Sequence, residues 1–217
     1  MPVCDACLKS PAPLEADYFC AVCNTPFMNP WPLDEAGVCA ACRSGLRGFD
    51  RAASFGAYEG QLRSLIHLFK YGGMTPLAPP LAAYMERALA VDDGYDAIVF
   101  VPLHWRKRRS RGFNQAELLS RCVAERRGLP VWNVLRRKRW TATQAGLANA
   151  GRRRNVAGAF VVRNNRQARQ LAGKRILLID DVMTTGATAS ACATALKRGG
   201  AGSVSLLTLA RVDRRII

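Results

Sequence analysis

The stretch ILLIDDVMTTGAT, residues 176–188, decides the fold that this sequence predicts. Four apolar residues run directly into two adjacent carboxylates, Asp180 and Asp181, and small and hydroxylated residues follow. An uninterrupted apolar run of this kind is typical of a strand in a parallel sheet, which helices cover on both faces. Ligands of such sheets bind beyond the carboxyl ends of the strands. The stretch therefore predicts a buried strand, RILLID (175–180), that delivers two acids to a binding edge.

Strand-like and helix-like segments alternate through the rest of residues 49–217. Asn114 with Glu117 three positions later predicts the start of a helix, and Gly128 predicts its end. Further strands are expected within residues 51–60, 97–104 and 203–210, and further helices within residues 61–73, 76–90 and 186–200. This alternation predicts an α/β domain with a parallel, Rossmann-like sheet and right-handed crossovers.

The residues after the acid pair have the chemistry of a phosphate site. Val182–Thr188 is expected to form the turn before a helix, where backbone amides and the helix dipole attract anions. Thr184, Thr185 and Thr188 add hydroxyl donors. Carboxylates beside a phosphate would repel it unless they bind hydroxyls or a metal, and a ribose 5-phosphate satisfies both halves of the pattern. The glycine patterns of the Walker A loop and of dinucleotide-binding folds are absent from the sequence.

Charge is distributed unevenly along the chain. Residues 1–48 hold three basic and five acidic residues, which leaves 29 basic and 11 acidic residues for 49–217 out of 32 and 16 in all. A surplus of 18 positive charges favours polyanionic partners, although arginine-rich solvated faces would give the same composition. The sequence has no apolar run long enough to cross a membrane and no pattern of a signal peptide at its start, so we expect no membrane insertion and a cytoplasmic location.

Six of the eight cysteines form three C-x-x-C pairs in residues 1–48. Such pairs supply two thiolates to one Zn²⁺, and two pairs complete a tetrahedral site; disulfides are the alternative in an oxidising compartment. Asn24, directly after the second pair, favours a ribbon built from Cys20, Cys23, Cys39 and Cys42. A rival set, Cys4, Cys7, Cys20 and Cys23, remains open, as does the role of Cys4 and Cys7. We expect a zinc ribbon in residues 1–48 and a ligand-binding domain in residues 49–217.

The segment 176–188 resembles the signature of type I phosphoribosyltransferases over all of its 13 residues. The resemblance implies 5-phosphoribosyl 1-diphosphate as ligand, together with Mg²⁺. It implies that Asp180 and Asp181 hold the ribose hydroxyls and that the turn holds the 5′-phosphate. The implied ligand-binding residues after the acids are Val182, Met183, Thr184, Thr185, Gly186, Ala187 and Thr188.

A second resemblance covers nearly the whole chain. Cysteine pairs, FDRAASFGAYEG, LFKYGG, VPLHWRKRRSRGFNQAELL and TQAGLANAGRRRNVAGAF precede the signature in the order seen in ComF-type proteins. These are competence-associated, phosphoribosyltransferase-like proteins with an N-terminal double zinc ribbon. The family commonly has four cysteine pairs and this chain has three, which supports the set of Cys20, Cys23, Cys39 and Cys42.

Basic segments are interpreted in the light of this family. Pro102 and Leu103 follow a strand and lie where the fold places its pyrophosphate loop, and Arg106 and Arg111 are expected to contact the diphosphate. Lys70 either reaches the same site or is a solvated helix end. Residues 143–160 match the hood that covers the diphosphate in transferases, with Gln144, Arg152 and Asn155 as candidates. The catalytic candidates are Asp180, Asp181, Arg106, Arg111 and Arg152.

Two functions remain open at this point. The first is a phosphoribosyl-diphosphate-binding protein of DNA uptake or natural transformation, with single-stranded DNA and competence-machinery proteins as partners. The clusters 106–111, 136–140 and 152–154 and the side chains of Trp105 and Trp140 favour it, unless both tryptophans are buried anchors. The second is an active phosphoribosyltransferase of nucleotide salvage or metabolism with an unidentified acceptor, for which the sequence shows no general base.

Overall fold

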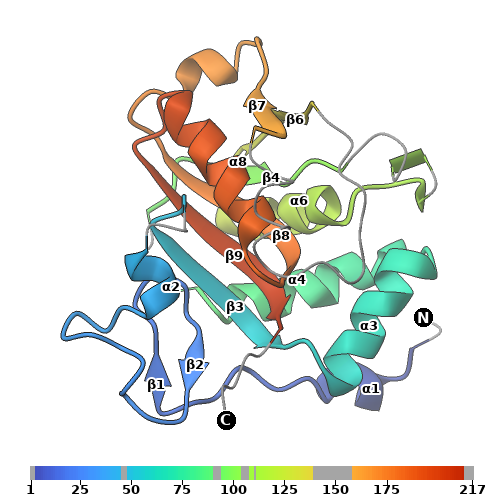
Figure 1. Ribbon diagram of the computed structural model, residues 1–217. Coiled ribbons are helices and arrows are strands. Elements are labelled where there is room, and N and C mark those ends of the chain that lie inside the picture. The colour runs from blue at the N-terminus through green and yellow to red at the C-terminus, as the bar shows by residue number, and fades with distance from the viewer. Residues whose placement is uncertain are drawn as a thin grey trace.

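The computed structural model describes residues 3–44, 48–89, 94–103, 108–109, 111–138 and 158–212. Its centre is a five-stranded sheet in the order β3-β9-β8-β4-β5, in which every neighbouring pair is parallel (Figure 1). The strands are β3 (Arg51–Ala57), β4 (Ala97–Phe100), β5 (Val131–Trp132), β8 (Arg175–Met183) and β9 (Ser203–Arg211). The predicted α/β fold class is confirmed.

Helices cover both faces of the sheet, as the apolar strands require. The covering helices are α3 (Gly60–Tyr71), α4 (Ala78–Glu86) and α6 (Gln115–Arg127) on one face, and α8 (Ala187–Arg198) on the other. Alternate residues of β8 pack into two separate apolar cores: Ile176 and Leu178 face α8, whereas Leu177 and Ile179 face α3, α4 and α6. The 3-10 turns Thr75–Leu77 and Ala168–Gln170 and the hairpin of β6 (Leu135–Arg137) and β7 (Phe160–Val162) complete this part.

Local signals in the sequence explain where the helices begin and end. The side chain of Asn114 caps α6 by accepting a hydrogen bond from the backbone N–H of Ala116, and Gly128 ends the helix in the left-handed conformation. Leu62, Leu65, Ile66 and Phe69 form the buried stripe of α3 at the predicted spacing. None of the helices in the described part of the chain is long and apolar enough to cross a membrane.

The N-terminal residues spread along one side of the sheet rather than gathering at one place. Helix α1 (Asp5–Lys9) lies beside α3, where Leu8 packs against the core beneath α3 and α4 (Figure 1). The strands β1 (Tyr18–Phe19) and β2 (Pro26–Phe27) and the helix α2 (Ala40–Arg43) lie apart from α1. The backbone N–H of Leu14, between these two groups, donates to the carbonyl of Phe55 in the edge strand β3. Cys4 and Cys7 are therefore held away from the other two cysteine pairs.

Three predicted strand limits are corrected. The strand expected at 97–104 ends at Phe100, and the strand expected to end at Asp180 continues to Met183. Asp180, Val182 and Met183 pair with Thr208, Ala210 and Arg211 of β9, which runs one residue further than expected. The prediction that Val182 and Met183 belong to the turn is therefore wrong, because pairing with β9 keeps both residues extended.

Candidate functional site

The acid pair lies where β8 has lost one of its two neighbours. The last pair between β4 and β8 joins Phe100 to Ile179, whereas β8 and β9 remain paired up to Met183. Among the described residues, Asp180 to Met183 are thus next to β9 on one side, and no strand closes the opening on the other side. This opening is at the carboxyl edge of the parallel sheet, the place where α/β folds bind ligands.

The two acids face opposite sides of the sheet because they are neighbours in an extended strand. Asp181 faces α3, where its Oδ1 lies 3.0 Å from Nζ of Lys70. Both side chains are largely buried, with 12% of Lys70 and 16% of Asp181 exposed. Burial alone would lower the pKa of the Lys70 ammonium, but the charge of Asp181 and the hydrogen bond with it raise the pKa above its usual range. Lys70 therefore reaches the predicted site and is not a solvated helix end.

Asp180 faces α8 and the β6–β7 hairpin. Burial and the nearby charge of Asp181 raise the pKa of its carboxyl to about 7, and the charges of Lys70 and Arg137 act against this rise. The Asp181 backbone N–H also donates to Asp180 Oδ1, at 2.9 Å. Beneath the acid lies Cys192 of α8, which is buried and whose thiol pKa is raised well above its usual range by that burial. Asp180 therefore changes its charge near neutral pH.

The turn between β8 and α8 forms a small pocket. Gly186 caps α8 with φ 73°, a left-handed conformation in which a residue without Cβ carries no strain. The backbone N–H of Ala187 donates to Oγ1 of Thr185 at 3.3 Å, while Thr184 is exposed. A hollow of about 40 Å³ lies inside this turn, and its lining includes Asp180, Thr184, Gly186 and Thr188. The hollow thus joins one acid to the N-terminus of a 12-residue helix.

The other predicted ligand residues are placed only in part. Pro102 and Leu103 follow β4 at the same edge, because the Val101 N–H donates to the carbonyl of Ile179. The guanidinium of Arg111 lies 4.8 Å from the ring centroid of Tyr71, the residue after Lys70. The remaining candidates lie outside the described residues: Trp105, Arg106, Trp140, Gln144, Arg152 and Asn155.

The structure describes residues 136–138 of the basic cluster expected at 136–140, and these three side chains do not form one surface. Arg136 and Lys138 are exposed, but Arg137 between them turns inward, half-buried with its guanidinium 5.4 Å from the centroid of Phe160. Burial lowers the pKa of Arg137, and the charge of Asp180 acts in the opposite direction. The alternation of strand β6 causes this inward turn. Arg137 therefore points inward, where its charge acts on Asp180, and does not belong to the charged surface that the sequence predicts.

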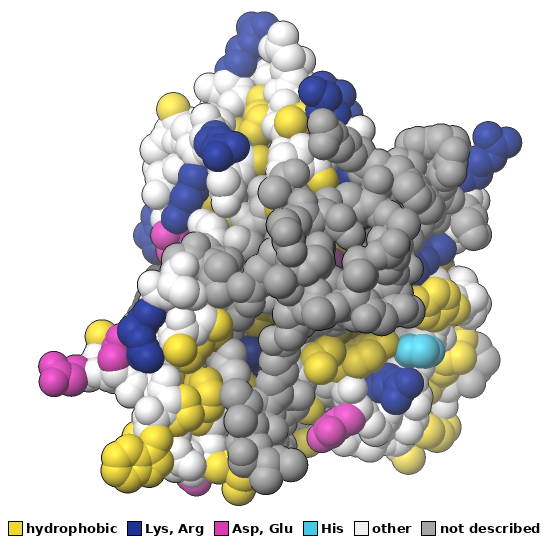
Figure 2. Space-filling model, viewed as in Figure 1, with side chains coloured by type: hydrophobic (Ala, Val, Ile, Leu, Met, Phe, Trp, Pro, Cys, Tyr) yellow, Lys and Arg dark blue, Asp and Glu magenta, His cyan; other side chains and the backbone are white. Residues whose placement is uncertain are grey.

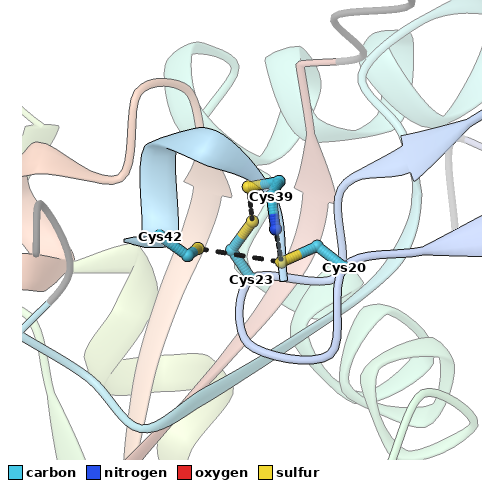
Figure 3. A group of neighbouring side chains, drawn as sticks. All are labelled: Cys20, Cys23, Cys39 and Cys42. Carbon is cyan, nitrogen blue, oxygen red and sulfur yellow. Dashed lines mark hydrogen bonds between the residues drawn. The ribbon is translucent and has the colours of Figure 1, made fainter. Parts of the chain in front are cut away.

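The thiols of Cys20, Cys23, Cys39 and Cys42 converge on one point (Figure 3). All four sulfur atoms lie within 4.8 Å of one another, with 3.8 Å between Cys20 and Cys42 and 3.7 Å between Cys23 and Cys39. A tetrahedral zinc site with Zn–S bonds of about 2.3 Å separates its sulfur atoms by about 3.8 Å. Asn24 has the left-handed conformation (φ 52°) expected after the second pair. The four residues therefore fit a structural Zn²⁺.

Cys4 and Cys7 contribute nothing to this cluster, so the rival set of Cys4, Cys7, Cys20 and Cys23 is wrong in this structure. The cluster instead contacts the parallel sheet through a residue that sequence reasoning missed. Buried Arg211, at the end of β9, donates to the carbonyl of Cys23 at 2.7 Å and to Oγ1 of Thr25 at 2.6 Å. The only signal of this contact in the sequence is the position of Arg211, a lone arginine at the end of an apolar strand.

Comparison with known proteins places this geometry in a class. The family model described as "Phosphoribosyl transferase domain" matches residues 124–216, which include β8, the turn and α8. The chain therefore contains a domain of the phosphoribosyltransferase class, as the segment 176–188 predicts.

Relatives over most of the chain identify the family. The chain is 31% identical to "Competence protein F" of Haemophilus influenzae over 75% of this chain and 73% of that protein. It is 33% identical to "DNA utilization protein YhgH" of Salmonella typhi over the same shares, and 28% identical to "Competence protein ComFC" of Bacillus subtilis over 71% of this chain and 61% of that protein. The chain belongs to the family of competence protein F, the ComF-type proteins that its segments resemble.

Proposed function

We propose that this protein binds 5-phosphoribosyl 1-diphosphate, or a related ribose phosphate, at the carboxyl edge of β8 and acts in DNA uptake or utilisation. The observation that carries the ligand is the continuous arrangement of acid pair, hollow and helix N-terminus in residues 180–188. The turn and the α8 N-terminus bind the 5′-phosphate, while Asp180 and Asp181 accept hydrogen bonds from the ribose hydroxyls. The names of the relatives support the role in DNA handling.

Two metals have different parts in this proposal. Zn²⁺ held by Cys20, Cys23, Cys39 and Cys42 is structural, because four thiolates leave no open position for a substrate. Mg²⁺ prefers carboxylate and phosphate oxygens and supplies charge neutralisation at the diphosphate. Asp181 is already paired with Lys70, so we expect Mg²⁺ to arrive with the diphosphate rather than to occupy a site made by the protein alone.

Calorimetry with phosphoribosyl diphosphate and Mg²⁺ tests the ligand. The variant Asp180→Asn/Asp181→Asn should bind at least about tenfold more weakly than the wild type, because each lost charged acceptor costs about 1.5–3 kcal/mol. Asp96→Asn is a matched control: Asp96 is also paired with a lysine, Lys174, but it lies before β4 at the opposite edge of the sheet. Failure of the wild type to bind would refute the site. Ribose 5-phosphate in place of the diphosphate shows how much of the affinity the turn supplies.

Two further measurements test the role. Release of diphosphate with candidate bases would reveal a transferase, the second function considered, whereas tight binding without release is expected of a sensor or an assembly switch. In a naturally transformable host that lacks its own relative, the wild-type chain should restore transformation and Asp180→Asn/Asp181→Asn should not. If the wild type and the variant restored transformation equally, the role in DNA handling would not depend on the ribose-phosphate site.

A further inference from the structure

Helix α3 carries a row of aromatic rings next to the ribose-phosphate site. Tyr58, just before the helix, lies 6.3 Å from His67 between ring centroids, and His67 lies 5.4 Å from Tyr71. A hydrogen bond of 3.0 Å between His67 Nε2 and the Tyr58 hydroxyl fixes two of the rings. We call these three residues the α3 aromatic strip.

Arginines flank the strip at both ends. The guanidinium of Arg63 lies 5.9 Å from the centroid of Tyr58, and that of Arg111 lies 4.8 Å from the centroid of Tyr71. Tyr71 is 67% exposed even with Arg111 beside it, so its side chain is accessible to a ligand. Figure 2 shows the histidine, in cyan, bordered by hydrophobic and basic side chains on the visible face.

Packing explains only one end of the strip. Tyr58 packs in part against the core beneath α3, whereas His67 and Tyr71 are exposed. The apolar stripe that α3 buries consists of other residues, Leu62, Leu65, Ile66 and Phe69. A protein partner would require a continuous apolar patch. Helix α3 does not offer one, because Leu68 is its one exposed large aliphatic side chain. Rings that alternate with guanidinium groups are instead the composition that binds unstacked bases and their phosphates.

Electrostatics distinguishes this surface from the most exposed aromatic side chain in the described chain. Trp31 is 88% exposed, but it lies in the net-acidic residues 1–48, close in sequence to Asp34 and Glu35. The α3 aromatic strip belongs to residues 49–217, with their surplus of 18 positive charges. One acid, Glu59, is exposed beside Tyr58, so the Tyr71 end is the more favourable for phosphates.

We propose that the α3 aromatic strip stacks the bases of single-stranded DNA, with Arg63 and Arg111 at its phosphates. Because Lys70 joins α3 to Asp181, a strand on the strip runs alongside the ribose-phosphate site. The strand must be single, since in a duplex the faces of each base are stacked on the neighbouring base pairs. The inference rests on the proposed role in DNA handling and specifies the surface that performs it.

Fluorescence anisotropy with a labelled oligo-dT of about 20 nucleotides tests the strip, because one base stacked on an aromatic ring contributes about 1–3 kcal/mol. Tyr71→Ala should weaken binding about 5- to 150-fold, a range that follows from that energy. Tyr71→Phe keeps the ring and should bind within about twofold of the wild type, and Trp31→Ala should bind as the wild type does. Arg63→Gln should lower the slope of log affinity against log salt by about 0.7, the contribution of one phosphate contact on a single strand.

Four outcomes would overturn the inference. They are no oligonucleotide binding by the wild type, wild-type affinity in Tyr71→Ala, an equal loss in Trp31→Ala, and competition by dTMP at nucleotide-equivalent concentration, which indicates a pocket for one nucleotide. Calorimetry with phosphoribosyl diphosphate on the same variants separates this inference from the proposed function. Wild-type protein that binds the diphosphate but no oligonucleotide refutes the strip and leaves the ribose-phosphate site intact. Unchanged circular dichroism of Tyr71→Ala, expected because the ring is exposed at the end of α3, shows that the fold is kept.

Discussion

Replacement of Lys70 by alanine is the most direct test of the charge arrangement at the site. The ammonium of Lys70 lies 3.0 Å from Asp181, and little of either side chain is exposed. The variant leaves Asp181 without its partner, beside a second carboxylate that is also buried. A hydrogen bond to a charged group contributes about 1.5–3 kcal/mol, so we expect the free energy of unfolding to fall by about 2 kcal/mol at pH 6.5.

The loss should grow as the pH rises, because Lys70 also lowers the pKa of Asp180, which lies at about 7 in the wild type. Asp180 binds its proton more tightly in the folded than in the unfolded chain, so folding loses stability as pH rises through the folded pKa. Without Lys70 the folded pKa is higher, and this loss continues above pH 7. Each unit of added pKa shift contributes about 1.4 kcal/mol. We expect the destabilisation to be about 1 kcal/mol larger at pH 8.5 than at pH 6.5.

Urea unfolding at the two pH values measures both quantities. Lys174→Ala is the matched control, because Lys174 forms an ion pair of 2.8 Å with Asp96 but is 43% exposed. Exposed pairs contribute about 0–1 kcal/mol, so the control should lose little at either pH. Equal losses for the two variants, or a loss at Lys70 that shrinks towards pH 8.5, would refute the reasoning.

Three further predictions concern single residues of the site and of the cysteine module. Affinity for phosphoribosyl diphosphate should rise between pH 6 and 8 as Asp180, with a pKa of about 7, loses its proton and becomes a full acceptor; calorimetry should show a flatter profile for Asp180→Asn. Gly186→Ala should lower stability by about 1–2 kcal/mol, the strain of Cβ in the left-handed conformation, and a smaller loss in thermal unfolding would contradict the observed φ of 73°. Arg211→Met should lower stability by about 2–4 kcal/mol, because it leaves the buried carbonyl of Cys23 unpaired, and should accelerate Zn²⁺ loss to a chelator. Unchanged zinc release would show that Arg211 does not support the cysteine module.

Much of the fold could be predicted from the sequence because its signals are local. The apolar run of 176–179, the cap at Asn114 and the stop at Gly128 depend on residues within a few positions, and each predicted element is present. The cysteine set could also be preferred from spacing and from Asn24. The path of residues 10–17 along β3 decides between this set and the rival set, because it holds Cys4 and Cys7 away from Cys20 and Cys23. That path depends on a contact between distant segments, which the spacing of cysteines cannot predict.

The charge pairing of the site could not be predicted in the same way. Lys70 and Asp181 are far apart in the sequence, and the contact depends on how α3 packs across the end of β8. The inward turn of Arg137 follows from strand alternation in β6, but only once that segment is known to be a strand. The same alternation shows that adjacent acids in a strand must face opposite sides, so Asp180 and Asp181 do not lie on one face of the sheet.

This separation of the two acids resolves the conflict between carboxylates and a phosphate at one binding edge. Asp181 is neutralised from one face by Lys70, and Asp180 is balanced from the other face by Arg137 and by its own proton near neutral pH. The net charge beside the hollow is therefore close to zero or positive before any ligand binds. A phosphate can then approach the N-terminus of α8 without strong repulsion, and the ribose hydroxyls find at Asp180 an acceptor that is ionised when the pH exceeds about 7. The basic residues around the acids thus make the acid pair compatible with an anionic ligand, and their removal should weaken phosphate binding even though none of them lies in the turn.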